Sequence, residues 1–75
     1  MQMIYAVIKR YGQGEIEFMD WYCKPNSQLE IYEKIMEITN GNHALAANIS
    51  SWAELATEGE IYEFEEGEVE ILDID

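Results

Sequence analysis

The sequence predicts a single α+β domain in which a four-stranded, largely antiparallel sheet has helices packed on one face. Apolar and polar residues alternate near both ends of the chain, a pattern typical of strands. Between these regions, apolar residues recur every three or four positions, which is typical of helices. A chain of 75 residues has room for one core. Residues 1–75 are therefore expected to form one ββααββ domain.

The first two strands are expected to form a hairpin. Residues 3–10 are apolar on both faces until their last two positions, which is typical of a central strand. Residues 11–14, Tyr-Gly-Gln-Gly, supply a turn, and a second strand follows to residue 22 or 23. The alternation of this strand changes phase, and a bulge near Met19 would explain the change.

Two helices are expected in the middle of the chain. Pro25 ends the second strand, and Ser27 to Glu30 matches a capping box, in which two side chains satisfy backbone amides at a helix start. The pair Asn40-Gly41 supplies a left-handed stop. Apolar spacing over residues 43–57 predicts a second helical region. A further capping-box match at Ser51 to Glu54 leaves open whether this region is one helix or two.

A second hairpin is expected at the C-terminal end. Alternating runs at residues 61–64 and 69–72 are separated by Glu65-Glu66-Gly67-Glu68. Gly67 can take the left-handed position of a short turn between them.

Charge is the strongest feature of the composition. Sixteen acidic residues against four basic ones give a formal net charge of -12, and all four basic residues lie within the first 34 positions. This negative field repels nucleic acid and anionic membranes and attracts basic proteins. Direct binding to nucleic acid or to a membrane is therefore not expected, and no apolar run is long enough to span a bilayer.

No motif for catalysis, a cofactor or a metal is recognised, so we expect no enzyme activity and no cofactor. Cys23 and His43 are expected in unlike elements, as a partly buried strand cysteine and a histidine in the first turn of a helix. One cysteine and one histidine cannot build a structural zinc site. A single cysteine also favours a reducing, cytoplasmic compartment. Trp21 and Trp52 are expected to pack in the core, with a role as surface anchors as the alternative.

The acidic C-terminal hairpin is the candidate partner-binding surface. Alternate residues of a strand lie on one face about 6.5 to 7 Å apart. Glu63 with Glu65, and Glu68 with Glu70, would therefore place carboxylates at a spacing close to that of phosphates along a nucleic-acid strand, and Glu66 completes the acidic face. The alternative is a solvated face that keeps the domain soluble and discourages edge-to-edge aggregation.

These features predict a non-enzymatic intracellular protein-binding module whose acidic face engages a basic protein surface. The sharper form is a phage or mobile-element inhibitor that mimics nucleic acid and blocks a nucleic-acid-binding protein. Two alternatives stay open: a structural or assembly protein that pairs with another copy as a homodimer through sheet edges, and a small-ligand-binding protein or enzyme with a pocket between helices and sheet. Binding that weakens with salt, self-association insensitive to salt, and a concave polar-lined pocket would distinguish the three.

Overall fold

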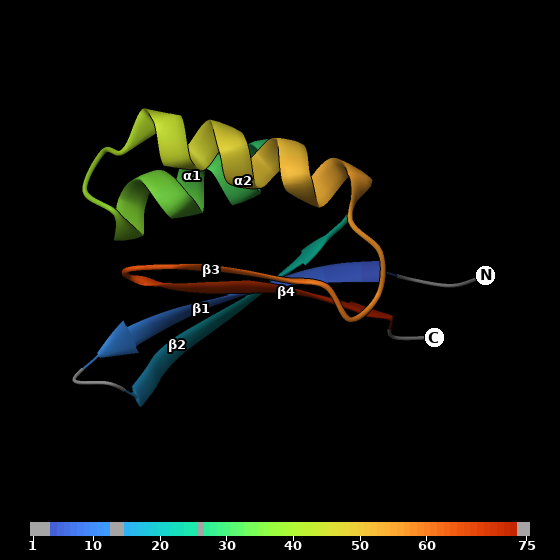
Figure 1. Cartoon of the computed structure of the whole chain (residues 1–75), viewed down its shortest axis with the longest axis horizontal. Helices are drawn as coiled ribbons and strands as arrows, with labels where there is room; N and C mark the ends of the chain where they lie inside the picture. The colour runs from blue at the N-terminus through green and yellow to red at the C-terminus, as the bar shows by residue number, and fades with distance from the viewer. Residues whose placement is uncertain (1–3, 13–14, 26, 74–75) are drawn as a thin grey trace.

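The computed structural model describes residues 4–12, 15–25 and 27–73 and shows two helices on one side of a single sheet (Figure 1). The strand order is β2-β1-β4-β3, and the described pairings are all antiparallel. The elements are β1 (Ile4–Gly12), β2 (Glu15–Cys23), α1 (Gln28–Ile38), α2 (His43–Leu55), β3 (Ile61–Phe64) and β4 (Gly67–Asp73). The predicted fold class and ββααββ order are confirmed. Residue 3, and residues 13 and 14 of the expected first turn, lie outside the described residues.

β1 is a central strand, as its two apolar faces predict. It pairs with β2 on one side and with β4 on the other. Ala6, Val7 and Ile8 are consecutive and all buried. Because strand side chains alternate between faces, Ala6 and Ile8 lie under the helices and Val7 lies on the opposite face.

The core fills the space between the sheet and the helices. The fully buried side chains come from both layers: Ala6, Ile8, Val69 and Ile71 from the sheet, Ile31 and Ile35 from α1, and Ala46, Ile49 and Ala53 from α2. Ala46 and Ala53 of α2 face this core, so the helix can approach closely with little side-chain bulk between it and its neighbours. In the described part of the chain, no helix is both long and apolar enough to cross a membrane.

Neither predicted capping box forms. Ser27 is the N-cap residue of α1, but its backbone dihedrals (φ -110°, ψ 18°) are not extended and its side chain makes no capping hydrogen bond. Ser51 lies inside α2, which is one continuous helix. The cap of α2 is instead Asn42, whose side-chain oxygen accepts a hydrogen bond from the Leu45 N–H at 3.0 Å.

The expected stop after α1 is confirmed. Asn40 and Gly41 have φ values of 58° and 96°, and the Gly41 N–H donates to the Met36 carbonyl at 2.8 Å. This bond satisfies one of the carbonyls that a helix leaves free at its C-terminus.

The bulge expected in the second strand is present. In β2, the pairing register shifts opposite Arg10 and Tyr11, so the bulge lies just before Met19.

The turn of the second hairpin differs from the prediction. Glu65 and Glu66 form the turn, and Gly67 is already the first residue of β4 without a left-handed φ. A Cβ atom at Gly67 would collide with the carbonyl oxygen of Lys9 on β1. Glycine is therefore required here because two strand backbones approach closely, a tertiary reason that the local sequence does not display.

Replacing Gly67 by alanine should destabilise the fold more than replacing Gly59. Gly59 has a φ of +88° but open space around it, so Gly59→Ala adds only backbone strain of about 1–2 kcal/mol. Gly67→Ala forces β4 away from β1, with an expected loss of about 3 kcal/mol in the free energy of unfolding. Urea unfolding of both variants measures the difference. Equal losses, or a larger loss for Gly59→Ala, would contradict the close-approach explanation.

Candidate functional site: the uncovered face of the sheet

The sheet face that the helices leave uncovered contains three of the predicted acidic residues. Val69 and Ile71 of β4 are buried in the core, so Glu68 and Glu70 lie on the opposite face. Glu63 of β3 is the register partner of Glu68 and lies on the same face. We call this surface the uncovered face, defined by Tyr5, Val7, Lys9, Met19, Trp21, Cys23, Ile61, Glu63, Glu68, Glu70 and Leu72.

Strand register arranges the uncovered face in rows that run across the sheet. One row contains, in order, Trp21, Val7, Glu70 and Ile61. The next row contains Met19, Lys9, Glu68 and Glu63. A third row, on the other side of the first, contains Cys23, Tyr5 and Leu72. The face is thus mainly apolar toward the start of β1 and charged toward the hairpin turns.

Large apolar side chains remain exposed on this face. Met19, Trp21 and Ile61 are 52%, 51% and 47% exposed, although Val7 between them is only 1% exposed. The Tyr5 and Trp21 rings meet edge to face, with centroids 6.3 Å apart. The expectation that Trp21 packs in the core is wrong, because both helices lie on the other side of the sheet. Trp52 does pack against the core, with its ring centroid 5.4 Å from that of Tyr62.

Two of the predicted glutamates have partners on β1. The Lys9 Nζ atom lies 2.7 Å from Oε1 of Glu70, in an ion pair that is largely shielded from water. The Tyr11 hydroxyl donates to Oε1 of Glu68 at 2.9 Å. This hydrogen bond is the main cause of a raised pKa of Tyr11, since ionising the phenol would break it and set two negative charges side by side.

The other three glutamates lack such partners. Glu63 lies directly opposite Glu68, so two carboxylates face each other across the β3–β4 pair. Glu65 and Glu66 are in the turn, so Glu65 does not continue the strand face of Glu63 as predicted. In the described part of the chain, none of Glu63, Glu65 and Glu66 makes an ion pair. The unpaired negative charge therefore lies at the hairpin end of the face.

Cys23 and His43 do not come together. Cys23 is exposed at the end of β2, which corrects the expectation of partial burial: its face of the sheet has no covering layer. His43 does lie in the first turn of α2, where its Nδ1 is 2.9 Å from the Tyr32 hydroxyl. The sheet separates the two residues. Within residues 4–12, 15–25 and 27–73, no three His, Cys, Asp or Glu side chains are grouped as metal ligands would be.

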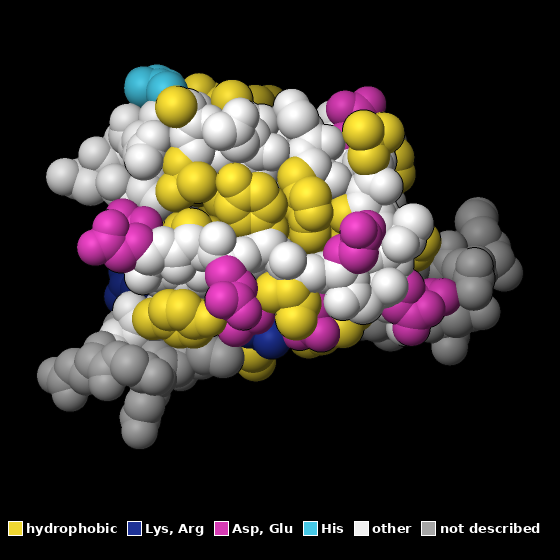
Figure 2. All heavy atoms as spheres, in the orientation of Figure 1, with side chains coloured by type: hydrophobic (Ala, Val, Ile, Leu, Met, Phe, Trp, Pro, Cys, Tyr) yellow, Lys and Arg dark blue, Asp and Glu magenta, His cyan; other side chains and the backbone are white. Residues whose placement is uncertain are grey.

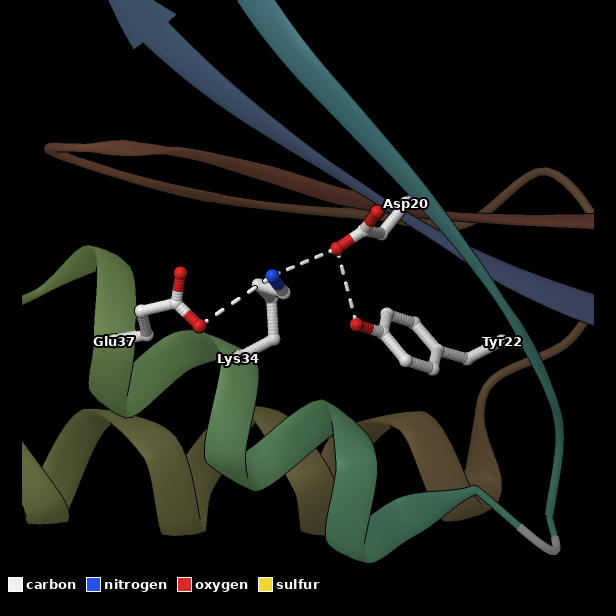
Figure 3. A network of polar contacts seen from close by, with 4 residues as sticks. All are labelled: Asp20, Tyr22, Lys34 and Glu37. Carbon is white, nitrogen blue, oxygen red and sulfur yellow. Dashed lines mark hydrogen bonds and ion pairs between the residues drawn. The ribbon is translucent and has the colours of Figure 1, made fainter.

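A polar network on the helix side attaches α1 to the edge strand β2 (Figure 3). Lys34 Nζ lies 2.9 Å from Oδ2 of Asp20, and the Tyr22 hydroxyl donates to the same oxygen at 3.1 Å. Glu37 approaches the lysine at 3.4 Å from the next turn of α1. The shared carboxylate closes the seam between α1 and β2.

The pKa shifts in this network favour the protonation states in which Tyr22 and Lys34 hold α1 to β2. Burial and the hydrogen bond to Asp20 raise the pKa of Tyr22 to about 12. The bond to Asp20 raises the pKa of Lys34 as well. At neutral pH the phenol is therefore protonated and the ammonium charged, so both act as donors to the carboxylate. A general base would need a pKa shifted toward neutrality instead.

The chain was also compared with models of known protein families, with curated proteins and with solved structures, and nothing matched.

The network predicts a loss of stability at high pH that depends on Tyr22. The unfolded phenol ionises near pH 10 and the folded one near 12, so the folded state keeps its proton longer. The stabilisation that the protonated Tyr22 contributes to the folded state is fully present below pH 10 and is lost as pH rises to 12. Tyr22→Phe should flatten the decline in unfolding free energy over this window. Urea unfolding at stepped pH measures it, and parallel curves for the two proteins would refute the assignment.

Charge reversal should change the stability of the fold differently at Glu63 and at Glu70. Glu63→Lys replaces a repulsive cross-strand pair by an attractive one and should hold or raise stability by up to about 1 kcal/mol. Glu70→Lys sets two ammonium groups together at Lys9 and should lower stability by about 1–3 kcal/mol. Urea unfolding of both variants at neutral pH checks this. Equal stability of the two variants would show that the Lys9–Glu70 pair contributes nothing.

Proposed function

We propose that this domain is a non-enzymatic protein-binding module whose uncovered face engages a basic protein surface with an apolar centre. The observation that supports this most strongly is the combination of half-exposed Trp21 and Met19 with the unpaired carboxylate of Glu63 on one continuous face. Exposed apolar groups rimmed by charge are typical of surfaces that bind other proteins.

Trp21 is the proposed anchor of the contact. Tryptophan is enriched among the residues that dominate binding energy, since it buries a large area with few rotatable bonds. Here the ring is held by Tyr5 and backed by the buried Val7, so it is positioned before a partner arrives. Little side-chain ordering would then oppose binding.

Charge selects the kind of partner. Lys9 is the only basic residue within the uncovered face as defined, and it already pairs with Glu70. The whole chain has a net charge of -12, which attracts basic surfaces over a distance of about 8 Å at physiological salt. A basic partner would therefore associate faster than a neutral one, and its association would slow as salt rises.

The arrangement supports a protein partner more directly than mimicry of nucleic acid. A mimic of the phosphate backbone, the narrower form in which this domain is a phage or mobile-element inhibitor, requires a run of free carboxylates. Glu68 and Glu70 are instead bonded to β1, and Glu65 lies in the turn. An exposed, unpaired Cys23 agrees with a cytoplasmic setting, where thiols stay reduced.

A second copy of this chain is the competing occupant of the uncovered face. A two-fold dimer through this face would bring its carboxylates close to those of the other copy, with one lysine per copy to offset them. Self-association of this kind should strengthen as salt rises, whereas binding to a basic partner should weaken. The sign of the salt effect therefore distinguishes the two occupants.

The test is quantitative capture from cells of the native host by the wild-type domain and by Trp21→Ala. Proteins with basic surfaces should be enriched by the wild type, and their yield should fall at least about tenfold with the variant, as the loss of a central tryptophan contact predicts. Raising the salt should lower the same yields.

Leu55→Ala is the matched control. Leu55 is exposed at the end of α2, on the helix side, so this variant removes apolar area without touching the uncovered face. It should capture the same proteins as the wild type. If Trp21→Ala folds and captures them at wild-type yield, or if salt strengthens capture, the proposal is wrong.

A further inference from the structure

Among the described strands, none pairs with the outer edge of β3, which therefore presents unpaired backbone groups. β3 is the terminal strand of the sheet, and its described partner is β4. An antiparallel ladder alternates residues that bond to the neighbour with residues that do not. The Ile71 N–H donates to the Glu60 carbonyl at 3.0 Å, which fixes the phase. The backbone groups of Tyr62 and Phe64 therefore point toward β4, and those of Ile61 and Glu63 point outward.

β3 also borders a group of partly buried apolar side chains that lies between it and α2. We call this group the aromatic seam; it consists of Leu45, Trp52, Tyr62 and Phe64. Trp52 of α2 and Tyr62 of β3 meet edge to face, and Leu45 lies two helical turns from Trp52 on the same side of the helix. Leu45, Trp52, Tyr62 and Phe64 pack against the core but are not fully buried. Figure 2 shows hydrophobic side chains gathered in a band between the helices and the sheet, with carboxylates around it.

The two edge strands of the sheet differ in the kind of contact that each makes with the helix above it. Beside β2, the bonds of Asp20 to Lys34 and Tyr22 close the gap to α1 with charge (Figure 3). The bulge in β2 also interrupts that edge. Beside β3, the contact with α2 is aromatic, and no ion pair among the described residues crosses it. The β3 edge is thus the one at which outward backbone groups adjoin an apolar contact between the sheet and a helix.

We propose that this edge binds an extended segment of a partner protein by strand addition, as a fifth strand beside β3. The register dictates the sequence pattern of the segment. Residues opposite Tyr62 would direct their side chains to the helix side, into the aromatic seam, and should be apolar. The residue opposite Glu63 would direct its side chain to the uncovered face and should be basic. Alternating apolar and basic residues satisfy both requirements.

Charge on β3 and around it argues for this occupant over a second copy. Antiparallel pairing of β3 with another β3 would bring Glu63 of each chain near the other, and Glu60 and Glu65 flank the same edge. Like charges directly opposite each other destabilise a strand pair. The same glutamates attract lysine or arginine on an incoming segment. This site goes beyond the proposed function, since Trp21 and the β2 side of the uncovered face take no part in it.

The probe is a capped peptide of alternating lysine and valine, about seven residues long, which spans β3 and its flanks. The control is a peptide of the same composition with lysines and valines in separate blocks. By isothermal titration calorimetry, the alternating peptide should bind at least about tenfold more tightly. N-methylation of alternate residues on the bonding edge should abolish this advantage, and equal affinity for the alternating and block peptides would overturn the proposal.

Two variants at position 63 distinguish the contribution of the backbone N–H to peptide binding from that of the side-chain charge. Glu63→Pro removes the outward N–H and leaves the β3–β4 bonds intact, since proline is accepted on an edge strand where its nitrogen faces water. Glu63→Gln keeps the N–H and removes only the charge. The proline variant should weaken peptide binding more than the glutamine variant. Equal affinities would show that the contact is charge alone and not strand addition.

Amide hydrogen exchange of the wild type provides a readout that does not depend on the folding of a variant. The Ile61 and Glu63 amides should exchange quickly in the free protein and become protected when the peptide is added. Trp21→Ala should show the same protection, because Trp21 lies on the far edge strand. Protection of these amides that increases with protein concentration in the absence of peptide would identify a second copy as the occupant and refute the proposal.

Discussion

Ala6, Val7 and Ile8 lose nearly all contact with water although helices cover only one face of the sheet. Burial of β1 on both faces is the constraint from which the other features follow. Two helices of 11 and 13 residues can cover one side of four strands. The opposite side of β1 must then be shielded by neighbouring strands, and this shielding places Trp21 beside Val7 on β2 and Glu70 beside it on β4.

The shielding explains why the uncovered face has a mixed character. An isolated apolar strand would leave Val7 in water, at a cost of about 1.5–3 kcal/mol relative to burial. The Tyr5–Trp21 contact protects it from one side and the Lys9–Glu70 pair from the other. Trp21 and Glu70 therefore support the fold and, in the proposed function, take part in recognition. A surface of this kind is more rigid than a loop, because its residues are fixed by strand pairing.

The asymmetry of the two sheet edges has a similar origin. α1 lies over the β2 side, where Lys34 reaches Asp20, and α2 lies over the β3 side, where Trp52 reaches Tyr62. In the charged contact between α1 and β2, the polar groups bond to each other and leave little for a further strand to bind. Aromatic contacts leave ring edges and apolar area that a further strand can cover. Which edge remains available is thus decided by which helix packs over it.

Sequence periodicity determined the element order and the central position of β1, and the pair Asn40-Gly41 determined the stop after α1, because each depends on neighbours a few residues apart. It also placed Glu68 and Glu70 on the face opposite Val69 and Ile71. Only the tertiary structure decided that Trp21 is exposed, that Glu70 pairs with Lys9, and that Gly67 is needed for close backbone approach. These three depend on which strands become neighbours and on which face the helices cover. Both are settled by contacts between residues far apart in the chain, which local patterns do not encode.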